Sequence, residues 1–363
     1  MTETDAEPPV DAGRARAQPA LASRGTPAQR ARVAVLRGLS WIACRLPERS
    51  TAPLADLAGW IWYKGAPSRA AQARRNFGRV ASSIAGRGIG SPLVRTAAAD
   101  SRALERLVQA AFRHDARYYL EVLRVPGLTP AIFDQRVVIE TPDTVEEAFA
   151  GGAVIFVAAH FGPIELPALY LANRSGRTFH APMEAVDDPA LQGWFEQTRG
   201  SLGVTIVGLR TARRELQAAL RAGGAIGIVA DRDIGGGGIA VPFFGSPAPL
   251  PIGPALLAIE SGARLYAVGV RRLADGRVGG RLIAIPIAAE GARRERITAT
   301  LTMMAQAFES LIGDAPEQWS GAFFPIWPDL AGGGPAVGPH HPDAPGASPP
   351  TSAMAASTGR RAG

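Results

Sequence analysis

The sequence has little of what several common classes of protein need. Its 363 residues include one cysteine, Cys44, which excludes an internal disulfide framework and a zinc site built from several thiolates. Only 7% of the residues are aromatic, so few rings are available to stack on the bases of a nucleic acid. Without any charge-free run of 18 apolar residues, no membrane-spanning helix is predicted. If the protein meets a membrane, we expect it to lie on the surface.

Acidic residues are fewer than basic ones, 32 against 39, which gives a net charge of +7. Such a surplus suggests an anionic partner, which is a nucleic acid, a membrane surface or a phosphate-bearing substrate. The first ten residues, MTETDAEPPV, carry acids where a secretory signal carries lysines, and no apolar stretch follows them. Export is therefore not expected, and the single cysteine fits a reducing cytoplasm.

Composition divides the chain into four segments. Residues 1–29 and 331–363 are rich in Ala, Pro and Gly without a hydrophobic period, so both are expected to be disordered. His340 and His341 in the second tail have no nearby third ligand, and no metal site is predicted. Residues 30–129 read as helical. Residues 130–330 alternate helix and strand, which favours an α/β fold with a mostly parallel central sheet flanked by helices.

The helical portion begins with an amphipathic pattern over residues 30–46, which Pro47 ends. At 100° per residue the apolar face carries Val35, Leu36, Leu39, Ile42 and Leu46, and the opposite face carries Arg30, Arg37, Trp41 and Arg45. The next segment offers Trp60, Trp62, Tyr63 and Lys64, side chains that favour the lipid headgroup layer. Two interpretations stay open: a helix that docks on an anionic membrane, or one whose apolar face packs on the core. Further helices are predicted over 68–80 and 104–123.

One unit recurs in the α/β portion. A helix over 143–150 ends at a glycine pair, and the apolar strand AVIFVAA then leads to His160. A helix over 212–222 ends at a second glycine pair, and the strand AIGIVA leads to Asp231. Since the carboxyl ends of parallel strands meet at one edge of a sheet, we expect His160 and Asp231 to face the same edge. Other strands are predicted over 178–183, 204–207, 264–270 and 282–287.

The segment HFGPIE follows the first of these strands. Pro163 suits the first position of a helix with Gly162 as N-cap, which places Glu165 in the first turn. Across such a corner the Glu165 carboxylate is expected to accept one N–H of the His160 ring. It would fix the tautomer and raise the basicity of the other nitrogen. Free N–H groups at the helix start would help to bind an oxyanion.

This pattern of His, four residues and an acid resembles the active-site signature of the lysophospholipid and glycerol-3-phosphate acyltransferase superfamily. Within it the chain is most similar to the bacterial lipid A late acyltransferases and the actinobacterial phosphatidylinositol mannoside acyltransferases. The resemblance covers about residues 32–330. Four further blocks carry it in order: ARRNFGRV (73–80), ALQGWFEQTRGSLGV (190–204), VADRDIGGGGIAVPFFGSPAPLPIGPALLAIESGA (229–263) and PEQWSGAFFPIW (316–327).

The resemblance implies acyl transfer without a cofactor. The donor would be an acyl thioester on coenzyme A or acyl carrier protein, and the acceptor a hydroxyl of a membrane glycolipid or lysophospholipid. The protein would be peripheral or monotopic at the cytoplasmic face of the cell inner membrane. His160 would be the general base, oriented by Glu165, with Asp231 as a second catalytic acid. The substrate-binding candidates are Arg199, Arg232, Asp233 and Glu260.

The corner departs from the family, because Phe161, Pro163 and Ile164 make it apolar, and this puts the acceptor in question. No G-x-S-x-G elbow is present, in agreement with direct transfer and no acyl-enzyme. Two alternatives remain. One is an esterase or thioesterase that uses His160 and Asp231 on water. The other is a non-enzymatic basic protein that binds an anionic membrane; nucleic acid is disfavoured as its partner by the low aromatic content.

Overall fold

The helices and strands of the computed structural model follow the sequence patterns closely. The structure describes residues 25–332 except 89, 168–169, 171–175, 185 and 202, so the predictions on the outer parts of both tails lie outside the described residues. The helices are α1 (Pro27–Arg45), α2 (Glu48–Gly65), α3 (Pro67–Gly86), α4 (Pro92–Ala97), α5 (Ser101–Arg124), α6 (Pro130–Arg136), α7 (Pro142–Phe149), α9 (Pro189–Gly200), α10 (Ala212–Arg221), α11 (Gly253–Ser261) and α12 (Arg293–Asp314). Short 3-10 helices are η1 (Val125–Gly127), η2 (Pro316–Gln318), η3 (Ser320–Phe323) and η4 (Pro328–Leu330).

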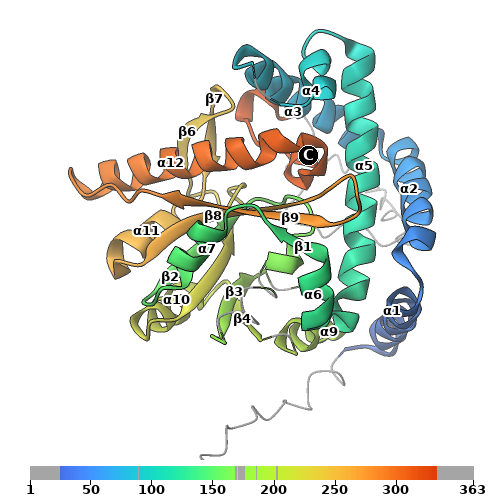
Figure 1. The fold of residues 1–363 in the computed structure, drawn as a ribbon, viewed down its shortest axis with the longest axis horizontal. Helices are drawn as coiled ribbons and strands as arrows, with labels where there is room; N and C mark the ends of the chain where they lie inside the picture. The colour runs from blue at the N-terminus through green and yellow to red at the C-terminus, as the bar shows by residue number, and fades with distance from the viewer. Residues whose placement is uncertain are drawn as a thin grey trace, which may run out of the picture. The chain divides into compact units, whose positions relative to one another are not determined.

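The strands are β1 (Val137–Ile139), β2 (Val154–Ala158), β3 (Phe179–Met183), β4 (Val204–Gly208), β5 (Ala225–Val229), β6 (Ile239–Phe243), β7 (Ser246–Leu250), β8 (Arg264–Arg272) and β9 (Val278–Ile285). The described residues hold a seven-stranded sheet in the order β1-β9-β8-β2-β5-β3-β4 and a separate β6-β7 hairpin. β8, β2, β5, β3 and β4 run parallel, and β9 pairs antiparallel with β8. The predicted α/β fold with a mostly parallel sheet is confirmed (Figure 1).

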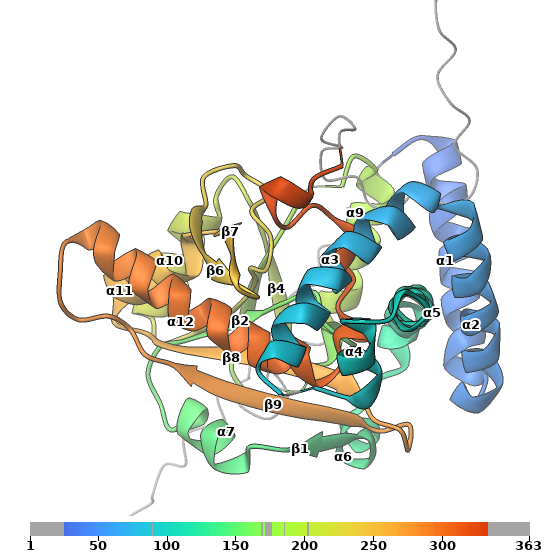
Figure 2. The ribbon, with the colours of Figure 1, turned by 90° about the horizontal axis from the view of Figure 1, so that it is seen from above.

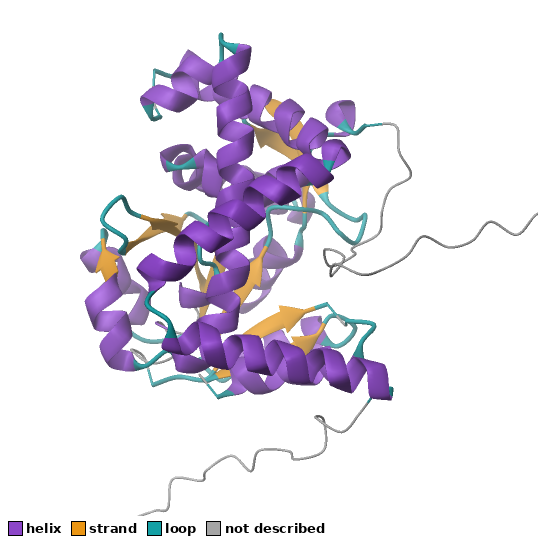
Figure 3. Ribbon diagram, turned by 90° about the vertical axis from the view of Figure 1, so that its right-hand side faces the viewer, coloured by secondary structure: helices purple, strands orange, loops and turns teal. Residues whose placement is uncertain are grey.

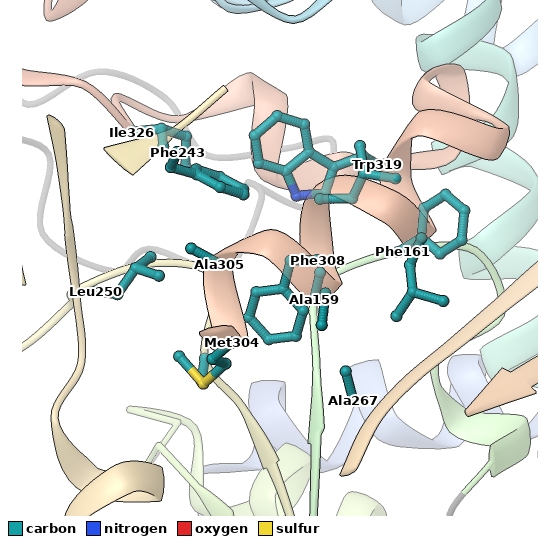
Figure 4. Packing of buried hydrophobic residues seen from close by; sticks show 14 of the residues in the cluster. Ala159, Phe161, Phe243, Leu250, Ala267, Met304, Ala305, Phe308, Trp319 and Ile326 are labelled. Carbon is teal, nitrogen blue, oxygen red and sulfur yellow. The ribbon is translucent and has the colours of Figure 1, made fainter. Parts of the chain in front are cut away.

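The two faces of the sheet belong to two hydrophobic clusters, because successive side chains of a strand point to opposite faces. Ile155 and Val157 of β2 join the larger cluster, with residues of α3, α5, α10, α11 and α12. Val154 and Phe156 join the smaller one, with residues of α6 and α7. Figure 2 shows α11 and α12 on one side of the β8-β9 pair and α7 on the other. Figure 4 shows Phe308 and Met304 of α12 in one cluster with Ala159, which directly follows β2, and Ala267 of β8.

The first helix begins earlier than predicted. Thr26 caps it by accepting the backbone N–H of Gln29, whose side chain bonds back to the Thr26 N–H, and Pro27 is the first helical residue. Residues 27–29, expected in the disordered tail, are therefore helical. Of the aromatic side chains that favour a headgroup layer, two pack within the protein: Trp62 lies against the rings of Phe112 and Phe323, and the Tyr63 hydroxyl bonds to Glu105.

The helical portion packs directly on the end of the chain. α5 contacts η2 and α3 contacts η3, while α2 and α1 lie against α5 as the outermost helices on that side (Figure 3). The helical and the α/β portions of the described residues thus belong to one compact unit. The same packing holds the 316–323 segment over the carboxyl end of β2, where Phe161 forms a β-bridge with Trp319 and the Gly162 N–H donates to the Gln318 carbonyl at 2.9 Å.

Gly162 generates the first prediction. Its φ is +60°, and an added Cβ would lie 2.0 Å from the Val270 carbonyl oxygen, so no side chain fits. We expect Gly162→Ala to lower the free energy of unfolding by about 3 kcal/mol, from backbone strain plus the clash. Gly152→Ala is the matched control, since Gly152 has φ +73° with open space around its Cβ position, and there we expect about 1 kcal/mol. Equal losses in urea denaturation would contradict this account of the corner.

Candidate active site

His160 and Asp231 meet because their strands end in register. Ala158 pairs with Val229 where β2 and β5 end, and both functional residues lie two positions further on. The Ala230 N–H continues the ladder by donating to the Ala158 carbonyl at 2.9 Å. At this level the Nδ1 atom of His160 lies 2.6 Å from Oδ1 of Asp231. The prediction that the two residues face the same edge of the sheet is confirmed.

Asp231 is completely buried, and both of its oxygens are engaged. Oδ1 contacts the His160 ring, while Oδ2 accepts the His160 backbone N–H at 3.1 Å and the Trp319 indole N–H at 2.8 Å. Burial alone would raise the pKa of Asp231, but the His160 ring, Arg232 and the Trp319 hydrogen bond outweigh burial and hold this pKa at about 2. The carboxylate is therefore ionised at neutral pH.

The 316–323 segment fixes the His160 backbone. The Ser320 N–H and hydroxyl both donate to the His160 carbonyl, at 2.8 and 3.1 Å. Gly321 is required here because a Cβ on it would lie 2.5 Å from Oδ2 of Asp231. The His160 side chain keeps 34% of its surface exposed. No other described residue bonds to its ring, so with Nδ1–H donating to Asp231 the Nε2 lone pair is free to accept a proton.

Glu165 does not hold the imidazole, and the predicted His160–Glu165 pair is wrong. Its carboxylate forms a bidentate pair with Arg199, at 3.0 Å from Nε and 2.5 Å from a terminal nitrogen, and receives the Tyr118 hydroxyl at 3.4 Å. The reason is the corner: Gly162 is a left-handed turn residue instead of an N-cap, and the helical residues begin at Glu165. The acid bonded to the His160 ring is therefore Asp231, which follows the neighbouring strand β5, and not Glu165.

Arg199 is the partner of Glu165 in this structure, and its predicted contact with a substrate anion stays a prediction. Its third donor faces the Met183 sulfur at 2.7 Å, and the guanidinium carbon lies 5.1 Å from the Phe195 ring centroid. Both members of the ion pair are mostly buried, with 21% of the Arg199 and 16% of the Glu165 side chain exposed. The Glu165–Arg199 pair is therefore part of the protein structure beside the turn at Gly162.

Two other acidic candidates also form hydrogen bonds with groups of the protein. Asp233 accepts the backbone N–H groups of Gly236, Gly237 and Gly238, so it shapes the glycine-rich loop over 235–238. Glu260 bonds to Arg213, Gln217 and Arg293 on neighbouring helices. It lies just before the start of β8, at the amino edge of the parallel strands and opposite to His160. Neither carboxylate supports the substrate-binding role predicted for it.

Further polar residues beside the corner, not predicted from the sequence, come from α5 and the 316–323 segment. A small polar cavity beside the corner is lined by Asp115, Tyr118, Gly162, Glu317 and Ser320, together with Ala111, His114, Arg272 and Gln318. Burial raises the pKa of Asp115 to about 7 against the lowering effect of Arg272, Arg69 and His160. An acid at helical spacing from Val108, Ala111 and Phe112 was a visible signal. Among the described residues, no group of three His, Cys, Asp or Glu is arranged to hold a metal ion.

The Asp231 pair predicts a pH dependence of stability. The pKa of about 2 lies below the ordinary 3.8, so the stabilisation is complete above about pH 4 and is lost as the pH falls through 2. Between pH 5 and pH 3 we expect wild type to lose about 1 kcal/mol more than Asp231→Asn, which has no group to titrate there. Urea denaturation of both proteins at the two pH values measures this difference. A constant gap between them would show that the carboxylate is not held by His160 and Trp319.

Comparisons with known proteins identify the family of the chain. The sequence pattern of the family described as bacterial lipid A biosynthesis acyltransferase matches residues 95–321. A phosphatidylinositol mannoside acyltransferase of Mycobacterium tuberculosis is 30% identical over 234 residues, which cover 62% of this chain and 68% of that protein. Its namesake from Mycolicibacterium smegmatis is 28% identical over 218 residues, 59% of this chain and 70% of that protein. Because the match spans more than half of the chain, from α4 to Gly321, this O-acyltransferase belongs to the bacterial lipid A biosynthesis acyltransferase family.

Proposed function

We propose that the protein transfers a fatty acyl group from a thioester of coenzyme A or acyl carrier protein to a hydroxyl of a membrane glycolipid. The observation that carries this proposal is the His160 ring, held at Nδ1 by the buried Asp231 carboxylate and open at Nε2. Among acceptors we favour a phosphatidylinositol mannoside, the lipid in the names of the two relatives, over a lysophospholipid. The donor carrier and the acceptor are both parts of the proposal.

His160 would act as the general base. Its Nε2 removes the proton of the acceptor hydroxyl as the oxygen attacks the thioester carbonyl, and Asp231 stabilises the imidazolium that forms. The tetrahedral intermediate collapses with loss of the thiol, which receives the proton back from the imidazolium. One C–O bond forms, one C–S bond breaks, and His160 returns to its neutral state. No acyl-enzyme is needed in this sequence.

We assign Glu165 and Arg199 a positioning role. Their bidentate pair joins the first helical residue after the corner to α9, and Tyr118 ties the same carboxylate to α5. A mostly buried pair of this kind is costly to break on one side, because the remaining charge loses its partner. The pair would keep the wall of the site rigid while Asp231 supports the base.

Membrane docking would use the apolar surface of α1 and α2. The side of α1 that packs inward carries Val33, Ser40 and Ala43, while its large apolar residues face outward. The exposed set, called here the α1-α2 surface, is Val35, Leu39, Trp41, Ile42, Leu46, Leu54, Leu57, Trp60 and Ile61. Arg45 lies over the Trp41 ring at 3.8 Å and Lys64 near Trp60 at 5.8 Å, so cations border it. This combination suits an anionic lipid surface.

The two helices lie at the outer edge of the molecule beyond α5 in Figures 1 and 2. Within the described part of the chain, none of the helices has the length and apolar character to cross a bilayer. We therefore propose peripheral attachment, at the cytoplasmic face of the inner membrane, where a thioester donor would be supplied.

The direct test gives purified protein an acyl-CoA or acyl-carrier-protein donor with and without phosphatidylinositol mannoside. We expect acylated glycolipid with the acceptor and little free acid without it, and His160→Ala supplies the background. Free acid at one rate in both reactions would return the esterase alternative, which membership in an acyltransferase family now disfavours. The non-enzymatic alternative would require that no acylated product forms with any lipid.

Two acid variants decide which carboxylate supports His160. Asp231→Asn keeps an acceptor for the Trp319 N–H but removes the charge at Nδ1, and we expect kcat to fall roughly 10³-fold or more. Glu165→Gln weakens only the Arg199 pair, and we expect a smaller loss, on the order of tenfold. Steady-state kinetics with a common donor and acceptor measure both values, with thermal unfolding as the check on folding. The reverse ranking would restore Glu165 as the partner of the base.

The α1-α2 surface gives a further prediction. Leu57, 54% exposed on α2, and Leu209, 51% exposed before α10, are matched in type and exposure. Leu57→Glu should weaken binding to vesicles with anionic lipid about tenfold, since insertion of one leucine contributes roughly 1.5–3 kcal/mol. Leu209→Glu should leave vesicle binding unchanged. Co-sedimentation with the vesicles measures both, and equal effects of the two variants would remove the docking role.

A further inference from the structure

Two arginines lie over the ring of Phe324. The guanidinium carbon of Arg232, in the loop after β5, is 3.8 Å from the ring centroid, and that of Arg69, on α3, is 5.4 Å from it. The three residues come from distant parts of the sequence, so the arrangement is built by the fold. Stacking on an aromatic ring orients a planar guanidinium and leaves its N–H edge available to a ligand.

Neither guanidinium has a hydrogen bond or an ion pair with another described residue, and the Nε atom of Arg232 is buried without a partner. A buried cation without an anion is unfavourable, and two like charges close together add to the cost. Burial and the nearby Arg69 lower the pKa of Arg232, while Asp231 and Glu184 act against them. A guanidinium nevertheless remains charged.

The carboxylates nearby do not neutralise these charges. Asp231 is already bonded to His160 and Trp319. Glu184 interacts electrostatically with Arg232 without forming an ion pair with it, and burial raises the pKa of Glu184. Asp115, which interacts with Arg69, has its pKa raised to about 7 by burial and is partly protonated at neutral pH. Neither Arg69 nor Arg232 therefore has a carboxylate bonded to it among the described residues.

The arginine pair borders the catalytic corner. Arg232 directly follows Asp231, and Asp115 is close enough to interact electrostatically with both Arg69 and His160. An anion held between the arginines would thus belong to a molecule that reaches His160. Both proposed substrates carry such a group, a phosphate on the pantetheine arm of the donor and a phosphodiester in the acceptor lipid.

We propose that Arg69 and Arg232, held over Phe324, bind a phosphate group of a substrate. The proposal rests on the proposed acyl transfer only for the choice of the molecule that carries the phosphate. Guanidinium groups bind phosphate oxygens with paired, charge-assisted hydrogen bonds, which supply the partners that both arginines lack. Arg232 is the main ligand because its Nε atom is buried without a partner and the residue directly follows Asp231, and Arg69 completes the site from α3.

Calorimetric titration of the full chain tests the site without turnover. The donor probes are 4′-phosphopantetheine and pantetheine, which differ only in one phosphate, and the acceptor probes are glycerophosphoinositol and phosphate-free inositol. We expect wild type to prefer the phosphate-bearing member of one pair by about tenfold to a hundredfold. Arg232→Gln should abolish that preference and Arg69→Gln should reduce it. Arg221→Gln, an exposed arginine at the end of α10, should retain it.

A preference within the donor pair assigns the site to the thioester, and a preference within the acceptor pair assigns it to the lipid. If wild type shows neither preference, or if a preference persists in both Arg232→Gln and Arg69→Gln, the proposed phosphate site is contradicted. Since an unpaired buried charge is removed, Arg232→Gln should unfold at or above the wild-type Tm; if it fails to fold, Arg69→Gln and the charge-retaining Arg232→Lys decide. If wild type transfers acyl groups but shows no phosphate preference, only the arginine site is contradicted. If wild type shows the preference but transfers no acyl group, only the proposed function is contradicted.

Discussion

The hydrogen bond between His160 Nδ1 and Asp231 Oδ1 depends on the pairing of β2 with β5 in one register. A slip of one residue would turn either side chain to the other face of the sheet and leave a buried carboxylate without its cation. Trp319 completes the arrangement, because its indole N–H occupies the second oxygen and its ring covers the carboxylate from water. The site thus needs three segments that meet only in the folded chain, which explains why α5 and the 316–323 segment pack so closely on the sheet.

Local signals were sufficient for most of the fold. The glycine pairs after α7 and α10 end their helices, with a positive φ at Gly151, Gly152 and Gly223, and the apolar runs that follow form β2 and β5 as expected. Because parallel strands share an edge, the pairing of His160 with Asp231 was within reach of the sequence. The choice of Glu165 instead failed at Gly162, whose turn is fixed by contact with Val270 and Gln318, both more than a hundred residues away. Tertiary contacts of this kind leave no trace in a short motif.

The amphipathic helix shows a different limit. Periodicity identifies an apolar side of α1, but it does not say whether protein or solvent faces that side. The structure packs α1 through Val33, Ser40 and Ala43, whose small size allows close approach to α5 and α9, and directs the larger residues outward. Size, rather than hydrophobicity, selects the packed face. The following aromatic residues divide in the same way, since Trp62 fills the core beside Phe112 while Trp60 remains exposed.

The carboxylates of the site are bonded to other groups of the protein. Asp231 is committed to His160, Glu165 to Arg199 and Asp233 to the glycine loop, each with its oxygens already occupied. The cations are not balanced in the same way, because Arg69 and Arg232 have no carboxylate partner among the described residues and Asp115 is partly neutralised by burial. In the proposed acyl transfer negative charge develops on the thioester oxygen, and cations without a bonded carboxylate would stabilise that charge in a partly dehydrated site. The net charge of +7 would likewise favour approach to the anionic membrane that is proposed to hold the acceptor.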